Sequence, residues 1–211
     1  MTIIFYDYAV APSPRRARIV LQEKNIAHET QEIDLMTGAQ LSKEFRAINP
    51  NATVPALKLE DGTVLFENWG IALWAEEIAP NPSLLGKTPT EKGLVASWTA
   101  KIDFHGTLAF AEAFRNTVPQ MKDRALPGVR NFPQVPELAE RGFARLQDFL
   151  GDLDLQLEKG EFVVGDNFSL ADIWAITILD ACRWIKVAPG EEHQHLQDWQ
   201  ARVSMRPSVK L

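Results

Sequence analysis

The sequence has very little cysteine: Cys182 is the only one among 211 residues. A single cysteine excludes an intramolecular disulfide and a cysteine-rich metal site, and we expect no metal in the function. We expect Cys182 to be a small buried apolar residue. No run of 18 apolar residues is present, so we expect no membrane span. The first residues lack the basic and apolar regions of a signal peptide, which favours a cytoplasmic protein.

An excess of basic residues is also missing. The chain carries 28 acidic residues against 22 lysines and arginines, for a net charge of −6. Nucleic-acid-binding proteins usually show a basic surface, so this balance argues against such a partner. The apolar fraction of 45% is ordinary for a globular protein, and the length allows one large or two small domains.

The first eighty residues alternate strand and helix patterns. The patterns predict strands at 3–6, 28–33, 55–59 and 63–66 and helices at 15–24, 42–48 and 68–78. This order implies a small mixed sheet covered by helices. A linker rich in proline follows over residues 79–86.

Residues 88–211 are predicted to be almost entirely helical. Thr88 begins one helix, with proline next and glutamate three residues on, and its apolar pattern continues to Ala109. Ser169 and Asp172 form a capping box at the start of another helix. Four prolines within 115–136 predict an irregular crossing before a helix at 138–157.

The stretch from Asn49 to Asn68 points to a ligand. Val54-Pro55 opens a strand, where an X-Pro bond can be cis, and it leaves the Val54 backbone free to pair outside the sheet. Glu67-Asn68 stands where a helix begins, and exposed N–H groups there favour a carboxylate. Together these features predict a site for a small peptide-like ligand, with glutathione as the leading candidate.

Four motifs, in this order and spacing, resemble those of the glutathione transferases over nearly the whole chain. They are Pro12 to Arg18, Asn49-Pro50 to Pro55, Glu67-Asn68, and Gly165 to Asp172. The resemblance implies an α/β plus all-α fold: a thioredoxin-like N-terminal domain (1–80) that binds glutathione, then a helical-bundle C-terminal domain (88–211) that lines the electrophile pocket. It also implies a homodimer and a role in detoxification.

The resemblance assigns roles within the glutathione site. The Val54 backbone would pair with the cysteinyl part of glutathione, and Glu67 and Asn68 would bind the γ-glutamyl end. Gln40 and Thr53 would contact the glycyl end or the backbone, unless they are solvated loop residues. The family usually has serine at the position of Asn68, and asparagine offers both a donor and an acceptor there.

The group that activates the thiol departs from the common pattern. The glutathione thiolate is the nucleophile, and a hydroxyl hydrogen bond near a helix N-terminus lowers the thiol pKa. This chain has Ala11 and Pro12 where relatives have cysteine or serine. Ser13 is the candidate catalytic residue, although it could instead cap the helix. Tyr8 is the second candidate, and Tyr6 is expected to pack in or beside the sheet.

Aromatic residues of the helical half are candidates for the electrophile pocket: Phe104, His105 and Phe110. His105 could instead be a satisfied core residue. Trp184 is expected either in the core, which is favoured, or at the edge of the pocket, where it would close it. The sequence thus predicts a glutathione transferase that conjugates the thiolate to a small, largely apolar electrophile, with peroxidase or dehalogenase variants using the same site. The alternative is a binding or scaffold protein that kept the fold without catalysis.

Overall fold

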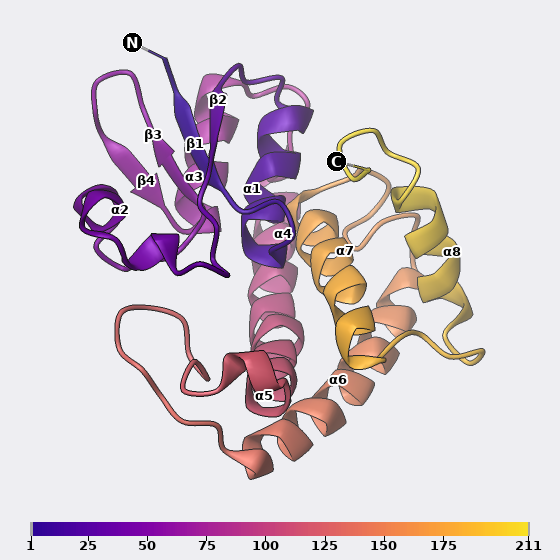
Figure 1. Cartoon of the computed structure of the whole chain (residues 1–211). Coiled ribbons are helices and arrows are strands. Elements are labelled where there is room, and N and C mark those ends of the chain that lie inside the picture. The colour runs from indigo at the N-terminus through magenta and orange to yellow at the C-terminus, as the bar shows by residue number, and fades with distance from the viewer. Residues whose placement is uncertain (1, 211) are drawn as a thin grey trace. The chain divides into compact units, whose positions relative to one another are not determined.

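The computed structural model describes residues 2–210, which divide into two compact units (Figure 1). Unit 1 consists of the chain up to Pro82 together with residues 127–130, and unit 2 consists of residues 83–126 and the chain from Asn131 onward. Unit 1 contains β1 (Ile4–Asp7), α1 (Pro12–Glu23), β2 (Glu29–Glu32), the 3₁₀-helix η1 (Ala39–Leu41), α2 (Lys43–Ile48), β3 (Ala56–Lys58), β4 (Val64–Phe66) and α3 (Asn68–Ile78).

The four strands of unit 1 form one mixed sheet in the order β2-β1-β3-β4. β1 runs parallel to β2 and antiparallel to β3, and β3 is antiparallel to β4. Phe5 lies opposite Leu57, and Tyr6 lies opposite Ala56. Since side chains alternate along a strand, the first pair faces one side of the sheet and the second pair faces the other.

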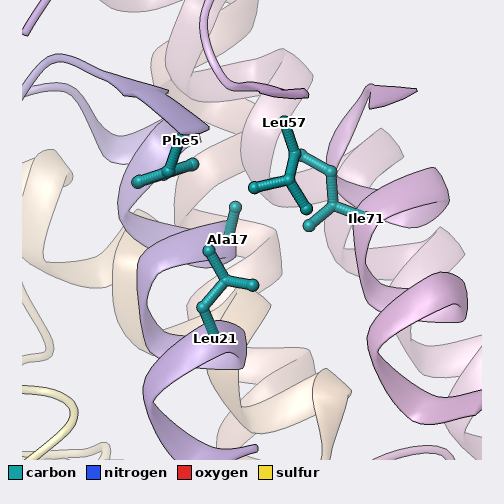
Figure 2. Close-up of a cluster of buried hydrophobic side chains, with 5 residues drawn as sticks. All are labelled: Phe5, Ala17, Leu21, Leu57 and Ile71. Carbon is teal, nitrogen blue, oxygen red and sulfur yellow. The ribbon is translucent and has the colours of Figure 1, made fainter. Parts of the chain in front are cut away.

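Helices cover both faces of this sheet. Phe5 and Leu57 pack with Ala17 and Leu21 of α1 and Ile71 of α3, all fully or almost fully buried (Figure 2). On the other face, Tyr6, Val54 and Ala56 pack with Phe45 of α2. Because α1 and α3 share one face, the same apolar cluster fixes both helices relative to the sheet.

The predicted order of strands and helices in unit 1 is confirmed, with two differences. α1 begins at Pro12, three residues before the predicted start, because proline fits the first helical turn. The alternating pattern of residues 28–33 predicts that every second residue of this strand is buried, but all four residues of β2, an edge strand, are exposed. The predicted Asp61-Gly62 hairpin joins β3 to β4, with Gly62 at a positive φ of 89°.

Unit 2 is a bundle of helices. Its elements are α4 (Pro89–Lys101), the π-helix η2 (Ile102–Thr107), α5 (Leu108–Thr117), the 3₁₀-helix η3 (Pro119–Met121), α6 (Pro136–Leu157), α7 (Leu170–Cys182), the 3₁₀-helix η4 (Arg183–Ile185) and α8 (Gln194–Val203). α7 is the central helix, since all its residues except Asp180 are buried. Within residues 2–210, no helix combines the length and the apolar character that crossing a membrane requires.

The helix predicted from Thr88 to Ala109 is present without a break, but Ile102–Thr107 winds as a π-helix instead of an α-helix. Contacts from distant helices hold this segment. Trp174 of α7 donates its indole N–H to Asp103 at 3.0 Å. Gly106 leaves room for the Phe149 ring of α6, which a Cβ at this glycine would meet at 2.9 Å. Such segments are rare and frequently found at functional sites.

The predicted capping box at Ser169 is confirmed, and Asp172 does more than cap. Each oxygen of this fully buried carboxylate accepts two hydrogen bonds of 2.9 Å. The donors are the Ser169 N–H and hydroxyl, the Val163 N–H and the Trp199 indole N–H. Asp172 therefore ties the start of α7 to the preceding loop and to α8.

We predict that Asp172→Asn lowers the free energy of unfolding by about 3 kcal/mol. The amide NH₂ would replace one of the two carboxylate oxygens, and it would then face two hydrogen-bond donors that have lost their acceptor. Ser169→Ala, which removes one donor, should cost about 1 kcal/mol. Urea unfolding followed by circular dichroism measures both. A change below about 0.5 kcal/mol for Asp172→Asn would contradict this account of the α7 start.

Cys182 is buried as predicted, and burial raises the pKa of its thiol to about 12. Because only the thiolate reacts, and about one thiol in ten thousand is ionised at pH 8, the native protein should not react with Ellman's reagent at that pH. Protein unfolded in guanidinium chloride should release one equivalent of the coloured product. Rapid labelling of the native protein would show that Cys182 is accessible.

Candidate functional site

Ser13 lies in the first turn of α1, and no side chain caps the start of this helix. The helix N-cap is Ala11, so the prediction that Ser13 could be the cap is wrong: the helix already begins at Pro12. Pro12 and Pro14 have no amide hydrogen, and the Arg15 N–H bonds the Ala11 carbonyl at 3.4 Å. The Ser13 N–H is therefore the one amide of this turn with no acceptor within residues 2–210, and Ser13 is exposed.

The start of α3 is also uncapped by side chains. Glu67 is its N-cap residue and makes no side-chain capping bond, and the first turn holds no acidic residue. Glu67 has a positive φ of 64°, which is uncommon for a residue with a Cβ. Backbone strain of this kind is found at functional sites and ligand-binding turns. A helix start without a side-chain cap or an acidic residue favours an anion.

One hydrogen bond joins the two helix starts. Asn68, the first residue of α3, donates its Nδ2–H to Ser13 Oγ at 3.0 Å. Asn68 is 8% exposed, and its Oδ1 is buried with no hydrogen-bond partner within the described chain. Each helix start carries a partial positive charge of about half a unit, so an anion near both is favoured.

A second unpaired buried acceptor lies in η1. Gln40 is 8% exposed, and its Oε1 has no partner among residues 2–210. Buried polar atoms are almost always hydrogen-bonded, so each exception indicates a missing partner. The Gln40 amide can serve as a donor or an acceptor to that partner. Two such atoms in unit 1 fit a polar, peptide-like ligand.

The chain before β3 offers backbone groups to a ligand. The Val54-Pro55 peptide is cis, as expected, and the Val54 N–H and C=O have no hydrogen-bond partner within residues 2–210. Thr53 is held in place by the buried Asn49, whose Nδ2 donates to the Thr53 carbonyl at 2.8 Å and to its hydroxyl oxygen at 3.3 Å. The backbone at Thr53 is thus held in place, while the N–H and C=O groups of Val54 remain available to a ligand.

The two tyrosines differ in their surroundings. Tyr6 is buried and packs edge-to-face on Phe45, with ring centroids 5.8 Å apart, so the prediction that it packs in the sheet is confirmed. Tyr8 is half-buried in the loop after β1. Desolvation, followed by the Asp34 and Glu32 carboxylates, raises the pKa of Tyr8. Its hydroxyl is therefore protonated at neutral pH and can donate a hydrogen bond.

A partly buried ion pair, which the sequence reasoning missed, fixes this loop. Arg18 of α1 donates to both Asp7 oxygens at 2.9 Å and to the Ala9 carbonyl at 3.2 Å. A bidentate pair of this geometry is rigid. The sequence did offer one signal for this ion pair: Asp7 ends a strand, and Arg18 lies on the helix that follows.

In unit 2, Phe104 and His105 lie on the π-helix, and both are exposed. Their rings meet edge-to-face at 4.9 Å. The prediction that His105 could be a core residue is wrong, because the π-helix buries Ile102 and Gly106 instead. Arg145 of α6, another residue missed from sequence, donates to the Phe104 carbonyl and places its guanidinium 4.9 Å from the Phe104 ring centroid.

Phe110 belongs to a separate aromatic cluster of unit 2. Its buried ring stacks on Phe114 at 5.3 Å and 12°. Trp184 contacts both rings, at centroid distances of 6.1 and 5.6 Å. Trp184 is 50% exposed, so its predicted place in the core is wrong: it covers the edge of the cluster. The cluster presents an aromatic surface to solvent.

The structure thus joins Ser13 with Asn68 and its neighbour Glu67, and it pairs Phe104 with His105. Gln40, Thr53 and Val54 belong to the same unit as Ser13. No group of three or more His, Cys, Asp or Glu side chains in residues 2–210 is placed to hold a metal ion.

Comparisons with known proteins agree with this arrangement. Residues 11–78 match the family model "Glutathione S-transferase, N-terminal domain", and residues 117–207 match "Glutathione S-transferase, C-terminal domain". The chain is 32% identical to Glutathione S-transferase 2 of Saccharomyces cerevisiae, over 99% of this chain and 88% of the relative. It is 29% identical to Glutathione S-transferase F9 of Arabidopsis thaliana, over 94% and 90%.

Solved structures show the same similarity. The crystal structure of Gtt2 from Saccharomyces cerevisiae superposes with a TM-score of 0.89 at 32% identity, covering 98% of both chains. A glutathione S-transferase domain-containing protein of Marinobacter aquaeolei gives 0.89 at 31% identity, over 98% of this chain and 99% of that one. The predicted fold, a thioredoxin-like unit with a helical bundle, is confirmed, and the chain belongs to the glutathione transferase family.

Proposed function

We propose that this protein is a glutathione transferase that conjugates the glutathione thiolate to a small, largely apolar electrophile. The observation that carries the proposal is the pair of uncapped helix starts joined by the Asn68–Ser13 hydrogen bond, beside a buried acceptor that has no partner. Relatives named as glutathione transferases support it. We assign glutathione binding to residues 1–80 and the electrophile to residues 88–211.

Glutathione has groups that complement each feature of unit 1. The γ-glutamyl carboxylate suits the start of α3 at Glu67 and Asn68, where amide groups and the helix dipole favour an anion. The cysteinyl backbone would pair with the Val54 N–H and C=O. Gln40 and Thr53 would contact the glycyl end, where the Gln40 amide supplies a buried polar group.

Ser13 would activate the thiol. It offers a hydroxyl and an N–H at the start of α1, and both favour a thiolate over a thiol. A free thiol has a pKa of about 8.5, and lowering it by two units needs about 2.7 kcal/mol. Hydrogen bonds to a charged group contribute about 1.5–3 kcal/mol each, so these two donors are sufficient. Tyr8, which keeps its proton, is the second candidate donor.

The electrophile would be held by aromatic side chains of unit 2. Phe104 and the cluster containing Phe110 supply apolar surface, and the exposed His105 could polarise the electrophile or its leaving group. No cysteine lies at Ala11, so the reaction would proceed by direct attack of the glutathione sulfur. Peroxidase or dehalogenase chemistry would use the same thiolate. A scaffold protein would lack the thiolate while keeping the fold.

We also propose that the protein works in the cytoplasm as a homodimer, with a role in detoxification. Phe66 in unit 1 and Leu94 in unit 2 are large apolar side chains that are each 48% exposed. Light scattering at micromolar protein should give twice the chain mass of 23.7 kDa. Double substitution Phe66→Ser and Leu94→Ser should shift the mass toward one chain. A wild-type mass of one chain would contradict the dimer.

We predict that the bound glutathione thiol of the wild type has a pKa below about 7, and that Ser13→Ala raises this pKa by about one unit. The ultraviolet absorbance of the thiolate, followed against pH, measures both values. The rate constant kcat/KM with 1-chloro-2,4-dinitrobenzene at pH 6.5 should fall about fivefold in the variant, because the thiolate fraction at this pH would drop from about one half to about one tenth.

The matched control is Ser97→Ala, an exposed serine of α4 in unit 2, which should leave both quantities unchanged. Absence of binding at millimolar glutathione would refute the proposed function. Binding with an unshifted thiol pKa in the wild type would favour the scaffold protein instead. A shift that survives Ser13→Ala would move the role to Tyr8 or to the Ser13 N–H.

A further inference from the structure

The buried side chain of Asn68 carries both a hydrogen-bond donor and a hydrogen-bond acceptor. Its Nδ2–H donates to Ser13 Oγ at 3.0 Å, and its Oδ1 is buried and has no partner within residues 2–210. The residue is 8% exposed, so water does not readily satisfy that oxygen. This unpaired acceptor is an observation independent of the two helix starts, and it indicates a donor on the ligand.

The bond from Asn68 orients the Ser13 hydroxyl. A hydroxyl has one hydrogen and two acceptor lone pairs. Because Asn68 occupies a lone pair of Ser13 Oγ, the hydroxyl hydrogen is directed to another acceptor, and no such acceptor exists for it within residues 2–210. Hydrogen bonds in a chain polarise one another, so a hydroxyl that accepts a bond becomes a stronger donor.

The length of the asparagine side chain is needed for this contact. A serine at position 68 would place its hydroxyl about 1.3 Å closer to the backbone, the length of one C–N bond. The 3.0 Å contact with Ser13 would then exceed hydrogen-bond range. Asn68 and Ser13 are thus matched to each other across 55 positions of sequence.

We propose that Asn68 is a positioning residue for the thiol: its Nδ2–H holds Ser13 so that the Ser13 hydroxyl donates to the glutathione sulfur, while its Oδ1 accepts from the γ-glutamyl ammonium. This inference rests on the proposed function. It makes one amide side chain couple recognition of the γ-glutamyl end to activation of the thiol at the other helix start.

The test is the thiol pKa of bound glutathione in Asn68→Ala, Ser13→Ala and the double variant, each with its dissociation constant for glutathione. Asn68→Ala should raise the pKa by about as much as Ser13→Ala, about one unit. The double variant should shift it no further than Ser13→Ala alone, because both changes remove the same donated hydrogen bond. The rise of kcat/KM with pH should move upward by the same amount.

Two further substitutions sharpen the result and keep it readable if the alanine variant folds poorly. Asn68→Asp keeps the shape but only accepts, so it takes the Ser13 hydroxyl hydrogen and adds a negative charge. It should raise the thiol pKa more than Ser13→Ala does. Asn68→Ser should behave like Asn68→Ala. The matched control is Asn167→Ala, an exposed asparagine of unit 2, which should leave the pKa unchanged.

The outcomes separate this inference from the proposed function. If the wild type does not bind glutathione, or binds it with an unshifted thiol pKa, the proposed function fails and the inference fails with it. If Ser13→Ala raises the pKa while Asn68→Ala and Asn68→Asp change only the dissociation constant, the proposed function stands and the positioning role is overturned. Additive pKa shifts in the double variant would also overturn it.

Discussion

The packing of α1 and α3 on one face of the sheet is the constraint on which the site depends. Phe5, Leu57, Ala17, Leu21 and Ile71 form one buried cluster that holds both helices (Figure 2). With both helices fixed on the same strands, their first turns come within one hydrogen bond of each other. The contact between Ser13 and Asn68 therefore depends on the core that holds both helices.

The helix starts of this chain differ in how they are capped: Ser42 caps α2 in unit 1, and α6 and α8 in unit 2 begin without a side-chain cap. In unit 2, α4 and α7 each begin with a complete capping box, at Thr88 and at Ser169. In unit 1, α1 and α3 begin without any side-chain cap, and Glu67 adopts an uncommon positive φ. A missing cap alone does not indicate a ligand; at the start of α3 it is accompanied by the positive φ of Glu67 and the unpaired buried Oδ1 of Asn68.

Local signals made much of the fold predictable from sequence. The Val54-Pro55 peptide, the Asp61-Gly62 turn and the capping boxes each depend on residues within a few positions of one another, and each is confirmed. The π-helix was not predictable, because Trp174 and Phe149 hold it from other helices.

The candidate site shows the same division. Ser13 and Asn68 were recognisable one at a time, each from its place near a helix start. Their hydrogen bond spans 55 positions, and nothing in a single sequence indicates it. α1 also begins at Pro12, three residues before the predicted start, so Ser13 is a residue of the first turn and not its cap.

The central claim is that glutathione binds where α1 and α3 begin, and a titration of ¹⁵N-labelled protein followed by NMR tests it most directly. Saturable shifts of the Ser13 and Asn68 amides and of the Asn68 side-chain NH₂ on adding reduced glutathione are predicted; saturable binding that leaves these three signals unmoved would contradict the account.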